Sequence, residues 1–173
     1  MSSHGIWAQS LGGGGGAVTV LNPASEDGTT ATDRSDSSGT GGAITIDTAG
    51  TIQATGKNSH AIFAQSGFQL SDGSLKSGTD LGDTITITHS GLLTGGSGIG
   101  AAIHVDGGNE DNAITIAKGS TVSARSGLAV YGSFGNEMLI NNGSIVGDIK
   151  LNGGRSKERN WFYNNAGAYY QSR

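Results

Sequence analysis

The octapeptide SHGIWAQS occupies Ser3–Ser10, and a near copy, SHAIFAQS, occupies Ser59–Ser66, 56 positions further along the chain. Six of the eight residues are identical, and the other two exchange a small residue for a small one and one aromatic ring for another. Weaker copies, AIHVDG and GLAVYG, follow at 102–107 and 127–132. Each copy places an aliphatic residue two positions before a small or aliphatic one, which is typical of a strand with one buried face. Recurrence of such a strand indicates a repeat architecture.

Two other strand types recur between these copies. One alternates isoleucine with threonine, which predicts a half-buried β-strand, and its copies lie at 43–46, 84–87 and 113–116. The other begins with glycine a few residues later, and its copies lie at 50–54, 91–94, 119–124 and 143–147. No stretch has the apolar stripe of an amphipathic helix. The order of the three types is constant, so the sequence predicts an all-β parallel β-helix with three short strands per coil.

Stacking of the coils predicts which residues align. We expect an inward row of Ile6, Ile62, Ile103 and Leu128, and an outward threonine row of Thr45, Thr86 and Thr115. The intervals between the copies are unequal, so the excess residues should leave the coil as surface loops. Two polar, glycine-rich insertions are predicted at about 11–42 and 67–83. The whole chain, 1–173, is expected to form one β-helical domain.

The last residues carry the start of a further coil. The segment NWFYNNAGAYY at 160–170 resembles NEMLINNGSI at 136–145, with an offset of 24 positions. The inward register stays open, because Trp161 and Tyr163 compete with Phe162 for the buried face. We expect a truncated last coil at 160–173, whose open strand edge makes end-to-end self-association one alternative.

Composition limits the partners of the chain. Charged residues make up 14% of the 173 residues and the net charge is −4, so no basic surface for nucleic acid is expected. Glycine supplies 32 residues, far above average usage, which suits a slender core with tight turns. The chain has no cysteine, which fits either a cytosolic protein or an exported bacterial one. Residues 1–20 lack the basic and apolar pattern of a signal peptide and no apolar run approaches 18 residues, so neither a signal peptide nor a membrane-spanning helix is expected in this sequence.

An outward strip is the candidate ligand or partner site. Trp7, Phe63 and His104 should align on one face of the stack. The residues expected near them are Gln9, Gln65, Asp106 and Tyr131. Such a strip either docks a ligand or partner, or lies under one of the long loops, and the sequence leaves both alternatives open.

The remaining motifs predict no catalytic residue, metal or cofactor. Histidines and serines are present, but no Gly-x-Ser-x-Gly motif occurs, and the equivalent positions of His4 and His60 favour a role in turns. The acidic segment 106–112 resembles part of a calcium-binding nonapeptide but occurs once, so a solvated turn is predicted. The run Gly12–Gly16 lacks the Lys-Ser/Thr of a phosphate loop and is expected to be a flexible linker. The threonine row could bind ice only if the coils were flat and regular.

Several of these segments together resemble a known family. IWAQS followed by polyglycine, AIFAQS, NNGSIVGDI at 141–149 and NNAG at 164–167 are similar to the passenger domains of large bacterial autotransporters. This resemblance implies a right-handed parallel β-helix, export by type V secretion and display on the surface of a Gram-negative cell. It also implies that a C-terminal outer-membrane β-barrel, which this sequence does not contain, anchors the full-length protein.

The functional hypothesis is therefore a non-enzymatic passenger fragment: a rigid stalk or adhesin whose loops attach to a protein or glycan on a host or neighbouring cell. The alternative is a carbohydrate-active β-helix enzyme, such as a polysaccharide lyase or hydrolase. These enzymes need clustered carboxylates and basic groups, and the predicted strands contain few of either. Acidic residues from three neighbouring coils converging on one face would favour the alternative.

Overall fold

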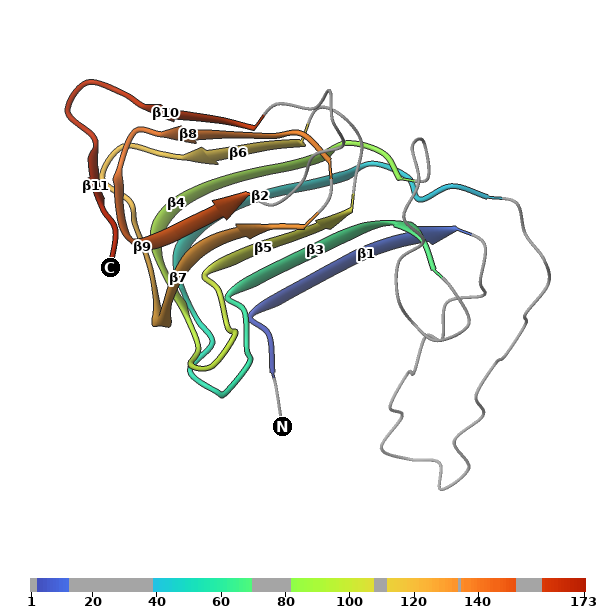
Figure 1. Ribbon diagram of the computed structural model, residues 1–173, viewed down its shortest axis with the longest axis horizontal. Helices are drawn as coiled ribbons and strands as arrows, with labels where there is room; N and C mark the ends of the chain where they lie inside the picture. The colour runs from blue at the N-terminus through green and yellow to red at the C-terminus, as the bar shows by residue number, and fades with distance from the viewer. Residues whose placement is uncertain (1–2, 13–38, 70–81, 108–111, 134, 152–159) are drawn as a thin grey trace.

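The computed structural model describes residues 3–12, 39–69, 82–107, 112–133, 135–151 and 160–173 (Figure 1). These residues form eleven β-strands and no helix, which confirms the predicted all-β class for this part of the chain. The strands are β1 Ile6–Gly12, β2 Ile44–Gln53, β3 Ile62–Phe68, β4 Ile85–Gly95, β5 Ile103–Gly107, β6 Asn112–Ile116, β7 Thr121–Gly132, β8 Glu137–Asn141, β9 Ser144–Leu151, β10 Trp161–Asn164 and β11 Tyr169–Gln171. The described residues accordingly contain no membrane-spanning helix.

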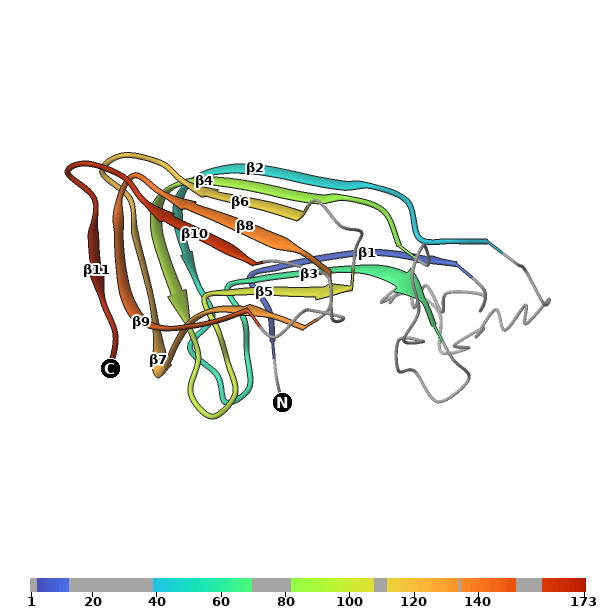
Figure 2. The ribbon, with the colours of Figure 1, turned by 45° about the horizontal axis from the view of Figure 1, so that its top comes forward.

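All strand pairs among the described residues are parallel and fall into three columns. The first column contains β1, β3, β5 and the second halves of β7 and β9. The second contains the first halves of β2 and β4, followed by β6, β8 and β10. The third contains the second halves of β2 and β4, the first halves of β7 and β9, and β11. Like strands of successive repeats lie side by side (Figures 1 and 2), which is consistent with a β-solenoid.

The register of the first column confirms the expected stacking of the octapeptide copies. Ile62 pairs with Ile6 on one side and with Ile103 on the other, in parallel orientation. Ile103, however, pairs with Val130, and the expected alignment with Leu128 is wrong. The chain turns from the third column into the first at Gly127, which has a φ of +87°, and the length of this corner sets the register. The observed partner, Val130, lies two residues after the expected one, so the same face of the strand is buried.

The threonine row is also displaced from its expected register. Thr45 pairs with Thr86, but Thr86 pairs with Ala113, and Thr115 pairs with Thr88. Eight positions separate Ile114 from Val122, whereas six separate the equivalent Ile87 from Leu93. The turn at 117–120 absorbs the two extra residues. Because side chains alternate with a period of two, isoleucine still meets isoleucine inside, while the outward threonines no longer form one continuous row.

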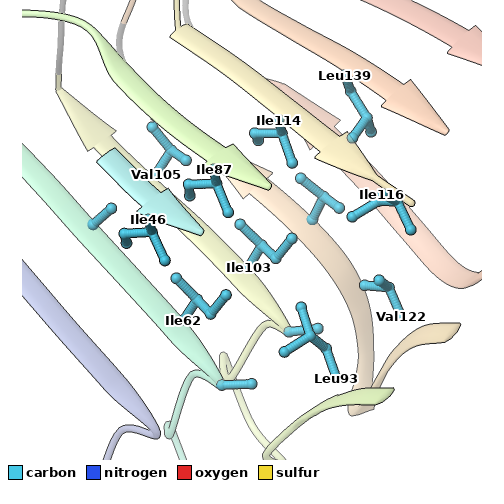
Figure 3. Close-up of a cluster of buried hydrophobic side chains, with 14 of the residues drawn as sticks. Ile46, Ile62, Ile87, Leu93, Ile103, Val105, Ile114, Ile116, Val122 and Leu139 are labelled. Atoms are coloured by element: carbon cyan, nitrogen blue, oxygen red, sulfur yellow. The ribbon is translucent and has the colours of Figure 1, made fainter. Parts of the chain in front are cut away.

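Inward rows of aliphatic side chains form the core (Figure 3). Ile46, Ile87, Ile114 and Leu139 are in register in the second column. Corresponding rows line the other two columns, so the core runs along the stack. Burying one such side chain fully contributes roughly 1.5–3 kcal/mol to stability, and many small contributions of this size hold the coils together.

Glycines make the sharp corner between the second and third columns possible. Gly50 and Gly91 are paired in register and have φ values of +92° and +122°. A Cβ atom at Gly91 would overlap the carbonyl oxygen of Gly50, whereas one at Gly50 would meet nothing within 4 Å. The stacked corner therefore requires glycine at position 91 for two reasons, backbone conformation and close approach of the chains.

The last coil shows which residues of the C-terminal aromatic segment face the core. Phe162 pairs with Leu139 in the core row, so Trp161 and Tyr163 point outward. The expected single offset of 24 is wrong. The offset is 23 in the second column, where Asn164 pairs with Asn141, and 25 in the third, where Tyr170 pairs with Ile145.

Every long connection joins the end of a first-column strand to the start of the next second-column strand. The flanking described residues bind each other: the hydroxyl of Ser66 donates to the carbonyl of Gly42 and accepts from the N–H of Asp83. β1 continues to Gly12 and β3 to Phe68, which is two residues into each of the insertions predicted at about 11–42 and 67–83. The greater part of both predicted loops, 13–38 and 70–81, lies outside the described residues.

Candidate functional site

Four rings form an aromatic row across the outward face of the first column. The aromatic row consists of Trp7, Phe63, His104 and Tyr131, which are in register on β1, β3, β5 and β7. Neighbouring ring centroids along the row are 4.7, 5.0 and 4.7 Å apart. The predicted alignment of the first three is confirmed. Tyr131 was expected only nearby, but the two-residue shift of β7 places it directly in the row.

The aromatic row is open at Trp7 and closed at Phe63. The Trp7 side chain is 54% exposed, whereas that of Phe63 is only 8% exposed. Phe63 lies between Trp7 and His104, and the imidazoles of His4 and His60 also contact its ring, with centroids 5.7 and 5.8 Å away. A ligand therefore reaches Trp7 more readily than Phe63.

A polar row runs beside the aromatic row, two residues further along each strand. The Gln9 Nε2 donates to Oε1 of Gln65 at 2.5 Å, and Gln65 Nε2 donates to Oδ2 of Asp106 at 2.7 Å. The hydroxyl of Ser133 donates to the other oxygen of Asp106. Gln65 is almost fully buried, so this chain of hydrogen bonds satisfies a polar side chain and ties four coils together.

Two further histidines, His4 and His60, pack against the aromatic row. The rings of His4 and His60 are stacked with centroids 5.1 Å apart, and those of His60 and His104 are 4.6 Å apart. Nδ1 of His4 accepts the backbone N–H of His60 at 3.1 Å, and Nδ1 of His60 accepts the N–H of Ala101 at 2.9 Å. The two equivalent histidines thus each bind the turn of the next coil, in line with the role that the repeat pattern favours.

Burial keeps these histidines neutral. Desolvation, together with the nearby His104 and His4, lowers the pKa of His60 to about 3. Desolvation also lowers the pKa of His104 to about 4, although the carboxylate of Asp106 opposes this shift. The pKa of His4 is lowered by burial as well. The cluster is therefore uncharged at neutral pH.

The fourth histidine, His89, does not join this cluster. Its side chain is fully buried in the core, where Nδ1 lies 2.9 Å from the hydroxyl of Thr48. Burial lowers its pKa. His89 therefore has a structural position rather than a place on the outward face.

The serine beside the aromatic row has no imidazole partner. Ser133 donates to a carboxylate rather than to an imidazole, so it lacks the adjacent base that activates a serine. Across the described ranges, no three His, Asp or Glu side chains are grouped so that they could hold a metal ion. Of the acidic segment 106–112, residues 108–111 lie outside the described part, as do residues 13–16 of the glycine run.

Sequence reasoning left open a second outward aromatic group, which Trp161 and Tyr163 form on β10. Their ring planes are within 8° of parallel, and both side chains are about half exposed. The signal was present in the sequence. Aligning Asn164 with Asn141 at an offset of 23 places Phe162 on Leu139 and turns the other two rings outward.

Comparisons of this chain with protein-family models, with curated proteins and with solved structures found no match.

Proposed function

We propose that this chain is part of a surface-displayed passenger domain, folded as a right-handed parallel β-helix, that acts as a non-enzymatic stalk or adhesin. Parallel register along all three columns supports this proposal, because it lets the chain extend coil by coil into a rigid rod. The autotransporter resemblance of the repeated segments suggests the export route and the cell-surface location.

The single observation that carries the proposal is the position of the long connections. All of them leave from the ends of first-column strands and return to second-column strands, where the flanking residues are bound to each other. Length variation at one corner leaves the stacked strands undisturbed, and binding residues are commonly carried on loops that a rigid scaffold positions. The inserted segments 13–38 and 70–81 are therefore the proposed attachment elements, toward a protein or glycan of another cell.

The proposal is tested by replacing segments 13–38 and 70–81, separately and together, with short Gly-Ser linkers. The chain would be displayed on a bacterial surface, and attachment of those bacteria to cultured cells and to immobilised matrix proteins would be counted. We expect unchanged far-ultraviolet circular dichroism of the purified variants and a loss of attachment. Attachment that persists without both segments, or its absence in the unmodified chain, would overturn the adhesive role.

A further inference from the structure

All four histidines of the chain lie toward one end of the stack. They are His4, His60, His89 and His104, and no histidine follows His104 in the sequence. A coil of a solenoid contacts only its neighbours, so a titrating group acts mainly on the junctions that contain it. A change in histidine charge therefore acts on the first coils rather than on the later ones.

Three of these histidines meet at a single junction. Strands β1, β2 and β3 form an N-terminal unit, which the parallel pairs β2–β4 and β3–β5 join to the rest of the stack (Figure 1). His60 precedes β3, and its Nε2 lies 3.2 Å from Nδ1 of His104 on β5. Nδ1 of His89 on β4 lies 2.9 Å from the hydroxyl of Thr48 on β2. Both strand pairs of the junction therefore have a histidine contact across them.

The folded junction has no place for a second proton on His60 or His104. Nδ1 of His60 already accepts the N–H of Ala101 at 2.9 Å, so the proton of the neutral ring is on Nε2 and points at Nδ1 of His104. Nε2 of His104 is buried without a hydrogen-bond partner among the described residues. Charging either ring therefore opposes a contact that crosses the junction.

Other titratable side chains near the junction do not take over this role. The described first-column strands carry Asp106, Tyr131, Asp148 and Lys150, and the adjoining turns carry Lys57 and Lys118. The carboxylate of Asp106 favours charged His104, but desolvation outweighs it. The register partners of His89, which are Thr48 and Ile116, do not titrate. Aspartate, tyrosine and lysine ordinarily titrate outside the range from pH 7 to 5.5, so histidine charge is what changes there.

The stack beyond the junction has a continuous core of its own. Ile87, Ile114 and Leu139 are in register in the second column, and Ile103 pairs with Val130 in the first. Separation of the N-terminal unit breaks none of these pairs. It exposes the edges of β4 and β5 instead.

We propose that the junction formed by β2–β4 and β3–β5 is acid-sensitive, so that mild acid separates the N-terminal unit from a β4–β11 stack that stays folded. Proton uptake by the hydrated rings of His60, His89 and His104 drives the separation. Each such histidine raises the ratio of open to closed junction by up to about tenfold per pH unit below 6.5. The inference does not rest on the proposed adhesive function.

The test is hydrogen–deuterium exchange of the full 173-residue chain at pH 7 and 5.5, read by mass spectrometry and corrected for intrinsic exchange rates. At pH 5.5 we expect opening at β2 and β3 to increase by about tenfold or more, whereas β8 and β9 should change by less than about twofold. His60→Gln with His104→Gln should remove most of the increase. Tyr131→Phe, which changes a neighbouring ring of the first column, is the matched control and should behave as the parent chain does. Circular dichroism at pH 7 would establish that each variant is folded.

Three results would overturn the proposal, and two of them need only the parent chain. Equal acceleration of β2, β3, β8 and β9 would mean that acid opens the whole stack as one unit. Unchanged exchange in all four strands would mean that the junction does not respond to acid. An undiminished increase at β2 and β3 in the folded double variant would assign the response to groups other than these histidines.

Discussion

Nε2 of His60 lies 3.2 Å from Nδ1 of His104, and a backbone contact decides which ring supplies the proton between them. Nδ1 of His60 accepts the N–H of Ala101, so neutral His60 carries its proton on Nε2 and donates it to His104. A second proton on His60 would have to enter at Nδ1, where a donor already points. Protonation of His60 in acid therefore opposes the hydrogen bond from Ala101 and weakens the contacts between the first three coils.

We expect the stability of the chain to fall as the pH is lowered from about 6.5 toward 4. The folded pKa values of His60 and His104, about 3 and 4, lie below the ordinary histidine pKa of 6.5, so the unfolded chain binds more protons in this window. Each such histidine adds a slope of up to about 1.4 kcal/mol per pH unit to the free energy of unfolding. Urea unfolding at pH 7.5, 6, 5 and 4 measures how the free energy of unfolding depends on pH.

A double variant tests whether these two histidines cause the slope. His60→Gln with His104→Gln should flatten the pH dependence, whereas Tyr131→Phe, which changes a neighbouring ring of the same row, should leave it as it is. An undiminished slope in the double variant would assign the acid sensitivity to other groups.

Replacing Asp106 by asparagine should lower the pKa of His104 further. The carboxylate of Asp106 favours the charged imidazole, and the amide of the variant carries no charge. NMR titration of the histidine ring protons measures the change. Asp47→Asn, on the exposed face of the second column, is the control and should not alter the titration of His104. A pKa for His104 that is unchanged or raised in Asp106→Asn would contradict the assignment.

Shortening one core side chain should cost far more than shortening an exposed one of the same type. Ile103 is fully buried between Ile62 and Val130, so Ile103→Ala is expected to lower the free energy of unfolding by about 2–5 kcal/mol. Ile99 is 69% exposed, and Ile99→Ala should change the free energy of unfolding by no more than about 0.5 kcal/mol. Similar losses in the two variants would mean that the inward row does not hold the coils together.

The stacked corner glycines allow conformational strain to be separated from close packing. Gly50→Ala should cost about 1–3 kcal/mol, because its positive φ is unfavourable for alanine. Gly91→Ala adds an overlap with the carbonyl oxygen of Gly50, so its cost should exceed that of Gly50→Ala by about 1–3 kcal/mol. Equal losses, measured by chemical denaturation, would show that the corner relaxes to admit the methyl group.

The repeated octapeptide was enough to predict the stacking of β1 on β3, because its residues are nearly identical and pair without a shift. The inward positions were also predictable, since alternation in a strand depends on local sequence alone. The aromatic alignment of Trp7, Phe63 and His104 followed from the same register.

The exact partners of the later strands could not be predicted in the same way. Val130 meets Ile103, and Thr115 meets Thr88, because two corners differ in length from those of the preceding coils. A shift of two residues leaves the buried face unchanged, so the hydrophobic pattern contains no information about it. The outward direction of Trp161 and Tyr163 was undecided for a related reason, since all three rings of that segment are apolar.

By itself, the sequence determined an all-β chain of parallel, stacked repeats and the residues that face its core, because both follow from local alternation and from repetition. Only the tertiary structure decided which coil positions meet, which rings lie buried and which stay open, and that Nε2 of His60 lies within hydrogen-bond distance of Nδ1 of His104. Those features depend on the lengths of the corners and on contacts between residues about 40 positions apart, which no local pattern encodes.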